Sequence, residues 1–276
     1  WAGLALSEAT LPWYVTENNS ERPWAEHLAA GEHAARRALA LDSANVRAWV
    51  ALGTVHRDRR QWPEAEAAFS RALALDPDDA EANQQYAEYL EYVGRIAEAV
   101  DMARRAVELD RVPVRLNVAA TSELLNGRYA EASAMFDAAD RLDPTDRGQF
   151  IKRNMLRAYL SRSDWTAARA LLGRFSGEDH EALRAAGATW PPDSPPTPEV
   201  AERITEWYPA AGAIAWMTLG RRERAIAALQ EAVDAHYGAT LFFWLPALEP
   251  LLDDPAVKAL LKRANLEGAR PRRTAP

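Results

Sequence analysis

The sequence contains no cysteine among its 276 residues. This absence excludes disulfide bonds, thiol catalysis and metal sites with thiolate ligands, because each of them requires cysteine. No apolar run reaches the length of a membrane-spanning helix, and no signal peptide is recognisable. These absences do not decide the compartment. We expect a soluble protein and slightly favour the cytoplasm over the periplasm.

Lysine is also scarce, since it stands only at Lys152, Lys258 and Lys262, and every other basic residue is arginine. The formal net charge is −7 and the sequence pI is about 5.4. An acidic chain argues against a general nucleic-acid surface, which needs clustered positive charge to contact phosphates. The short basic stretch at residues 270–273 is interpreted as a frayed terminus.

The usual sequence motifs of catalysis are missing as well. None of the five histidines stands in a His-Glu-x2-His or His-x3-His arrangement, which would place two ligands on one helix face. There is no glycine-rich phosphate loop, no Gly-x-Ser-x-Gly turn and no paired-carboxylate motif. We therefore expect no catalytic residues, no metal site and no cofactor, and we do not expect an enzyme.

A pattern that returns about every 34 residues is the strongest positive signal in the chain. Residues 49–77 read Trp-x2-Leu-Gly-x2-His, then Ala-x3-Phe, and end in Pro. Ala65 returns as Ala99 and again as Ala132, at spacings of 34 and 33 residues. Because the neighbouring positions return in the same register, a chance match is a poor explanation.

Each repeat has the pattern of two helices. Residues 46–59 place apolar side chains at the spacing of one helical face, and residues 63–75 predict a second helix. Pro63 falls in the first turn of that helix, where its missing N–H costs little, and Pro77 ends the helix. Ala65 is small where two helices must approach closely. One pair cannot bury its apolar faces alone, so the pairs are expected to stack.

This pattern resembles the tetratricopeptide repeat family, most specifically over residues 44–144. The resemblance implies an all-α fold, a right-handed solenoid of about six antiparallel helix pairs with a C-terminal capping helix. We expect a single solenoid over residues 1–276. Its expected parts are a repeat at 1–42 with an inserted loop at 11–21, clear repeats at 44–77, 78–111 and 112–144, a degenerate repeat at 145–175, a proline-rich linker at 176–198, a degenerate repeat at 199–237, a cap at 238–267 and a tail at 268–276.

Two features of the last third have alternative interpretations. The proline-rich segment 190–198 cannot be helical and favours an extended chain, preceded by a short helix at 178–186. It is either a linker or a docking strap for a partner. The tryptophans at Trp207, Trp216 and Trp244 either pack inside irregular repeats or form an aromatic patch for a partner.

The C-terminal end carries a second resemblance. An apolar strip, then Pro-x-Leu-x-Pro-Leu at 246–251, then Asp-Asp-Pro at 253–255 and an amphipathic helix follow one another. This order resembles the end of tetratricopeptide sensor regions in bacterial winged-helix transcriptional regulators and in some adenylate cyclases and kinases. The resemblance implies a regulatory or sensor module of a longer protein whose output domain precedes Trp1. Trp1 stands where a repeat's tryptophan belongs, so we expect the chain to start inside a repeat.

The leading hypothesis is a non-catalytic scaffold that binds a protein or peptide in the concave groove, with no nucleic acid as a partner. In the family, the first helix of each repeat lines that groove. The residues that this resemblance places in the groove are Arg47, Val50, Thr54, Arg57, Glu81, Gln84, Glu88, Tyr92, Asn117 and Thr121. Their mixture of charge and amide groups suits an extended segment of basic or mixed character. Only Asn117 resembles the family's carboxylate clamp, so binding of chaperone tails is not predicted. The pattern does not indicate an oligomeric state.

Overall fold

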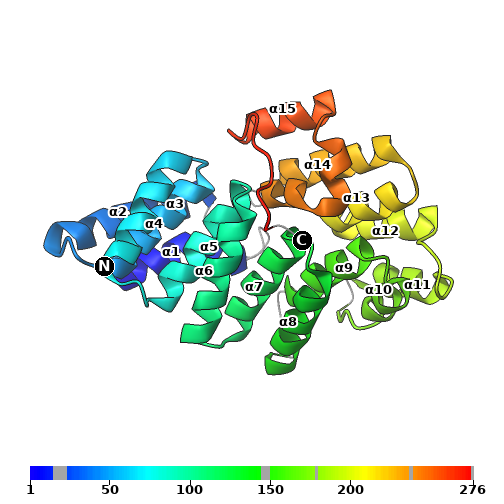
Figure 1. Cartoon of the computed structure of the whole chain (residues 1–276), viewed down its shortest axis with the longest axis horizontal. Helices are drawn as coiled ribbons and strands as arrows, with labels where there is room; N and C mark the ends of the chain where they lie inside the picture. Colours follow the sequence, from blue (N-terminus) through cyan, green and yellow to red (C-terminus); the bar gives the residue numbers. More distant parts are fainter. Residues whose placement is uncertain (15–23, 144–149, 178–179, 236–238, 275–276) are drawn as a thin grey trace. The chain divides into compact units, whose positions relative to one another are not determined.

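A computed structural model describes residues 1–14, 24–143, 150–177, 180–235 and 239–274. Within these ranges every regular element is a helix and no strand occurs, which confirms the all-α prediction (Figure 1). The internal contacts divide the chain into two compact units. The first comprises Trp1–Val93 and Glu98–Arg111, and the second comprises Gly94–Ala97 and Val112–Pro276.

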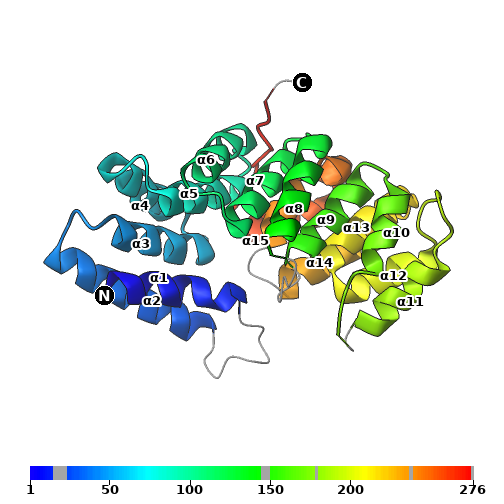
Figure 2. The same cartoon turned by 90° about the horizontal axis from the view of Figure 1, so that it is seen from below.

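The first unit is a stack of helices that pack side by side in chain order. α1 packs on α2, and α3 packs on both of them as well as on α4 and α5 (Figure 2). The sixth helix begins in the second unit and continues in the first. The bounds are α1 Ala2–Tyr14, α2 Trp24–Leu41, α3 Val46–Asp58, α4 Trp62–Leu75, α5 Ala80–Tyr92 and α6 Ile96–Leu109.

Capping residues explain where these helices begin. Asn45 and Asp79 have extended backbones and cap α3 and α5. The Asn45 side-chain oxygen accepts from the Ala48 N–H at 3.1 Å, and the Asp79 side-chain oxygen accepts from the Ala82 N–H at 2.7 Å. Pro63 stands in the first turn of α4, and Asp76 ends that helix in an extended conformation before a proline. The two helices expected at 46–59 and 63–75 are confirmed to within a residue.

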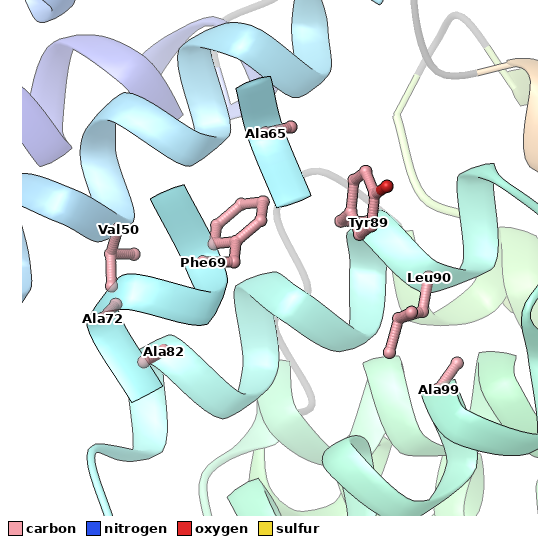
Figure 3. Close-up of a cluster of buried hydrophobic side chains, with 8 residues drawn as sticks. All are labelled: Val50, Ala65, Phe69, Ala72, Ala82, Tyr89, Leu90 and Ala99. Carbon is pink, nitrogen blue, oxygen red and sulfur yellow. The ribbon is translucent and has the colours of Figure 1, made fainter. Parts of the chain in front are cut away.

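The core of the first unit explains its small residues. Figure 3 shows the buried cluster of Val50, Ala65, Phe69, Ala72, Ala82, Tyr89, Leu90 and Ala99. A side chain added at Gly53 would place its Cβ 2.7 Å from the Phe69 ring. Gly53 is therefore small because the Phe69 ring of the neighbouring helix occupies the space.

The second unit is also a helical stack but a less regular one. Sequential helices pack on one another, and α13 also packs on α9, which lies much earlier in the chain. The bounds are α7 Pro113–Leu125, α8 Tyr129–Leu142, α9 Phe150–Ser161, α10 Trp165–Leu172, α11 Glu181–Thr189, α12 Pro198–Trp207, α13 Pro209–Thr218, α14 Arg222–Ala235, the 3-10 helices η2 Ala239–Trp244 and η3 Pro246–Leu251, and α15 Pro255–Arg263.

Two segments differ from the expectation. α1 continues to Tyr14, past the residue where the inserted loop was expected to begin, and residues 15–23 lie outside the described part. The proline-rich segment is a compact turn rather than an extended strap. Trp190 is buried and its indole N–H donates to the Ser194 carbonyl at 2.9 Å, while Asp193 has a positive φ. The turn closes because burial of the Trp190 indole holds the segment against its own helices.

The basic tail is the third difference. It was expected to fray, but residues 269–274 form defined main-chain and side-chain hydrogen bonds within the second unit. The Arg272 N–H donates to the Gly94 carbonyl, and the Ala97 N–H donates to the Arg272 carbonyl. A charge count could not reveal this, because the bonds use main-chain groups of a turn far away in the sequence.

Candidate protein-binding surface

The predicted groove residues fall into two sets, one in each unit. The first set comes from the two first helices of adjacent pairs in the first unit. It comprises Arg47, Val50, Thr54 and Arg57 on α3 and Glu81, Gln84, Glu88 and Tyr92 on α5. The second set, Asn117 and Thr121, lies on α7 in the second unit.

Arg57 is the centre of the first set. Its side chain is 2% exposed, and its Nε donates to the Asp58 carboxylate at 2.9 Å. One terminal nitrogen donates to Gln85 at 3.0 Å and to Glu88 at 2.9 Å. Its guanidinium carbon also lies 5.5 Å from the centroid of the Tyr92 ring. A planar fork of donors suits several oxygen acceptors at once, which explains why arginine stands here.

The charges of this cluster are coupled. Burial alone would lower the pKa of Arg57, but the carboxylates of Asp58 and Glu88 outweigh it, so the pKa is raised. Burial raises the pKa of Glu88 by more than the Arg57 charge lowers it. Burial also raises the pKa of Tyr92 well above 10.0. Arg57 is therefore permanently charged, and Tyr92 is neutral at neutral pH.

The α5 face continues this cluster as a row of paired polar groups. Gln84 donates to Glu88, and Gln85 donates to Glu81, each at 3.0 Å and each one helical turn apart. Glu88 is 23% exposed and Glu81 is half-buried, so both can be reached from outside. Sequence reasoning missed Gln85, although its spacing from Glu81 was a usable signal.

Not every predicted residue joins this row. Val50 is fully buried in the core of Figure 3, so the assignment of Val50 to a groove surface was wrong. Thr54 is buried, and its hydroxyl donates to the Val50 carbonyl at 3.1 Å. Arg47 is exposed on α3. The reason for the failures is that α5 packs directly on α3 and covers part of the face that the register places toward the groove.

In the second unit, Asn117 and Thr121 meet a residue that sequence reasoning missed. The Asn154 amide on α9 donates to the Asn117 side-chain oxygen at 2.9 Å and to the Thr121 hydroxyl at 3.4 Å. Arg157, one turn further along α9, donates to the Asn154 oxygen. Asn117 and Asn154 remain partly exposed. The result is a short row of amides across two helices.

Aromatic rings surround the arginines of α9. The Arg157 guanidinium carbon lies 4.3 Å from the Phe242 ring centroid and 5.5 Å from that of Tyr208. Arg153 lies 5.2 Å from the Trp207 ring and 5.8 Å from Tyr208. Burial raises the pKa of Tyr208 despite the two arginines, so this ring stays neutral. In the sequence, this site was indicated only by the four-residue spacing of Arg153 and Arg157, which places both on one face of α9.

Comparison with known proteins supports the repeat directly. A family model described as "Tetratricopeptide repeat" matches residues 46–88, which span α3, α4 and most of α5. No curated protein sequence matches the chain significantly.

Solved structures extend the tetratricopeptide fold beyond that repeat. PilW, described as a widely conserved type IV pilus biogenesis factor, is 14% identical with a TM-score of 0.55 over 91% of this chain and 98% of PilW. PilF of Pseudomonas aeruginosa is 16% identical with a TM-score of 0.50, over 87% and 95%. A chain of the Cut9–Hcn1 hetero-tetramer is 16% identical with a TM-score of 0.53, over 95% and 52%. Such likenesses establish the tetratricopeptide-repeat solenoid fold.

Of the two interpretations of Trp207, Trp216 and Trp244, their positions favour packing inside the repeats over an aromatic patch. Trp244 and Trp216 are buried, and the Trp216 indole donates to the Thr205 hydroxyl at 2.9 Å. Trp207 is partly exposed but stacks edge-on against Phe175, with centroids 4.4 Å apart. These rings therefore pack against other residues of the second unit, and the Trp216 indole has a polar partner there.

In the ranges that the structure describes, no three histidine, aspartate or glutamate side chains gather in a way that could hold a metal ion. Among the same residues, no helix combines the length and apolar character needed to cross a membrane.

Proposed function

We propose that this chain is a non-catalytic scaffold that binds an extended polypeptide segment, using the α5 row of Glu81, Gln84, Gln85 and Glu88. The observation that carries the proposal is that hydrogen bonds already hold these side chains in place. A preorganised row loses little side-chain entropy when a partner binds. The tetratricopeptide fold of this unit supports the same function, since stacked repeats present long continuous surfaces.

The chemistry of the row defines the partner. Glu81 and Glu88 can be reached from outside, and each carboxylate oxygen has more than one acceptor direction. A basic or mixed segment would place lysine or arginine against these carboxylates and donate main-chain N–H groups to them. Such contacts are screened by salt over roughly 8–10 Å. Affinity is therefore modest and decreases as the ionic strength increases.

A second peptide-binding surface is proposed in the second unit. It is the row formed by Asn117, Thr121 and Asn154. Its groups are amides and a hydroxyl, so it binds main-chain N–H and C=O groups rather than charge. This surface contributes little to the choice between basic and acidic partners.

A direct test uses defined peptides, because the natural partner is not identified. Fluorescein-labelled extended peptides of basic, acidic and mixed composition are titrated by fluorescence polarisation. Glu81→Lys reverses a reachable charge in the row, whereas Glu64→Lys makes the same change on the exposed face of α4. We expect the basic peptide to bind best and to weaken roughly fivefold in Glu81→Lys only. Equal binding by both variants would overturn the proposal.

The alternative function is a regulatory or sensor module of a longer bacterial protein. It is favoured by the C-terminal order of η2, η3 and α15, in which Asp254 caps α15 by accepting from the Ala256 N–H at 3.0 Å. The test is the reading frame that precedes Trp1. A winged-helix, cyclase or kinase segment joined in frame would support this function, and a nearby start codon would contradict it.

A further inference from the structure

Residues 269–274 are held as an extended peptide, drawn in red after α15 in Figure 1. The Arg272 N–H donates to the Gly94 carbonyl at 2.7 Å, and the Ala97 N–H donates to the Arg272 carbonyl at 2.8 Å. These two main-chain hydrogen bonds tie Arg272 to the turn at Gly94 and to the first turn of α6. Gly94 has a positive φ, and a Cβ there would lie 3.2 Å from the Arg270 carbonyl oxygen. The glycine therefore allows both the turn and the close approach of the tail.

The next residue, Arg273, occupies a pocket that satisfies its guanidinium on three sides. Its Nε donates to the Leu125 carbonyl and one terminal nitrogen to the Trp244 carbonyl, both at 2.7 Å. The other terminal nitrogen pairs with Glu249 at 2.7 Å. Leu125 and Trp244 are the last residues of α7 and η2, where the carbonyls have no acceptor role inside the helix itself and carry partial negative charge. A lysine could not reach three such acceptors.

Thr274 completes the contact at the turn between α7 and α8. Its main-chain N–H donates to the Asn126 side-chain oxygen at 3.0 Å. Its hydroxyl accepts from the Asn126 amide at 2.8 Å and from Arg128 at 3.1 Å. Three consecutive tail residues are thus recognised in three ways: by main chain, by a guanidinium pocket and by a side-chain amide.

The tail is held by polar contacts, and none of its side chains from Ala269 to Thr274 is buried. The last buried apolar side chain before it is Leu266. Between them stands Gly268, which has a positive φ and nothing within 4 Å of the position of a Cβ. The tail can therefore detach at Gly268 without opening the apolar core, because segments with few buried apolar contacts open locally at a low free-energy cost.

We propose that the surface formed by residues 94–97, residues 125–128, Trp244 and Glu249 is a peptide-recognition site for an extended arginine-bearing segment of another protein. We call this surface the tail cradle. The chain's own tail occupies it, and an external segment with the Arg-Arg-Thr order of residues 272–274 makes the same hydrogen bonds. The site uses none of the α3 or α5 side chains, so it is additional to the α5 row. Because the tail is tethered, it competes at a high effective concentration.

The experiment compares the full chain with a variant that ends at Glu267. The probe is a fluorescein-labelled peptide with the sequence of residues 269–276, followed by fluorescence polarisation. We expect the shortened chain to bind the probe roughly tenfold or more tightly than the full chain, because the tethered competitor is gone. A probe with Arg273→Lys binds the shortened chain roughly tenfold more weakly, because lysine loses the fork. If the shortened chain melts like the full chain but binds the probe no better, the proposal is overturned.

Further variants keep the test decisive if shortening disturbs the fold. In the full chain, Arg273→Ala releases the anchor while leaving every buried side chain in place, and it must increase probe binding. In the Arg273→Ala chain, whose own tail has lost its anchor, Glu249→Gln must weaken probe binding, whereas the matched change Glu231→Gln on the exposed face of α14 must not. Failure of either result overturns the cradle.

Two more outcomes distinguish the tail cradle from the α5 row and from self-association. Glu81→Lys leaves probe binding unchanged, so failure of the α5 row and failure of the tail cradle are distinguishable. If the full chain instead forms a dimer that Arg273→Ala abolishes, the occupant is the tail of a second copy, and the assignment to another protein is overturned.

Discussion

Among the residues that the structure describes, each of the two units has one buried arginine, and the two units offset the cost of burying that charge differently. Arg57 and Arg157 are both 2% exposed. Arg57 lies between carboxylates, with Asp58 and Glu88 each at 2.9 Å. Arg157 lies over the faces of Phe242 and Tyr208 and donates to an amide oxygen. Opposite charge offsets desolvation in the first unit, and the negative faces of aromatic rings contribute in the second.

The difference has consequences for how each unit responds to its surroundings. Carboxylates titrate and form a directional hydrogen-bonded network, so the Arg57 site depends on pH and on the geometry of the guanidinium. The raised pKa of Tyr208 keeps its ring neutral across the acidic and neutral range. The first unit therefore carries the more pH-sensitive site, because the carboxylates around Arg57 titrate while Arg57 itself stays charged.

The largest expected effect follows removal of the first arginine. Arg57→Met leaves Asp58, whose side chain is 1% exposed, without its guanidinium partner. Breaking a buried ion pair from one side costs about 3–5 kcal/mol. Urea unfolding should show this loss, and hydrogen exchange should show it first in α3 and α5. Arg47→Met, an exposed change on the same helix, should cost about 0.5 kcal/mol or less. Equal costs would contradict the role of the network.

The closest helix contacts provide a second comparison. A Cβ at Gly212 would lie 2.6 Å from the Thr205 Cα, which is a main-chain atom, whereas one at Gly53 would meet the Phe69 ring at 2.7 Å. Overpacking costs about 1–3 kcal/mol. We expect Gly212→Ala to cost more than Gly53→Ala, because a helix backbone yields less readily than a side chain. Thermal melts of both variants check this order, and the reverse order would show that the regular unit is the tighter one.

Coupling between ring and arginine is the third effect. In a double-mutant cycle, Phe242→Leu and Arg157→Met are combined, and the coupling free energy of unfolding is measured. We expect about 1–2 kcal/mol of favourable coupling, since the cation lies over the ring in a desolvated position. Additive costs would show that the ring only fills space, and the contrast between the units would then rest on the carboxylates alone.

The smallest expected effect is the pH response of the first unit. Because the pKa of Glu88 is raised in the folded state, the folded chain binds this proton more tightly than the unfolded chain. Stability from this group is therefore present below the unfolded value and lost as pH rises through the folded pKa. Glutamine does not titrate, so Glu88→Gln does not lose stability in this way. The difference in urea midpoint between the unmodified protein and Glu88→Gln therefore changes as pH rises above 4.5. Arg57, Glu81 and Asp58 face the same carboxyl, and a constant difference would contradict its raised pKa.

Sequence reasoning predicted the fold well and the candidate surface only in part. The helices at α3 and α4 follow from apolar spacing, caps and prolines, all of which act within one or two turns. The predicted groove contained Val50, which is core, and omitted Gln85 and Asn154, which complete the two polar rows. The position of a residue in the repeat predicts which way its side chain points, but not how closely the next helix packs over it.

The sequence by itself determined the repeat, the helical class and the starts of most helices, because these depend on neighbours three or four residues apart. Tertiary structure alone decided which acceptors surround Arg57, which rings surround Arg157, and that the basic tail is bound. The Arg273 pocket combines carbonyls from the ends of two helices and one carboxylate. Main-chain carbonyls carry no signature in the amino-acid sequence, so only the folded chain could bring that pocket into view.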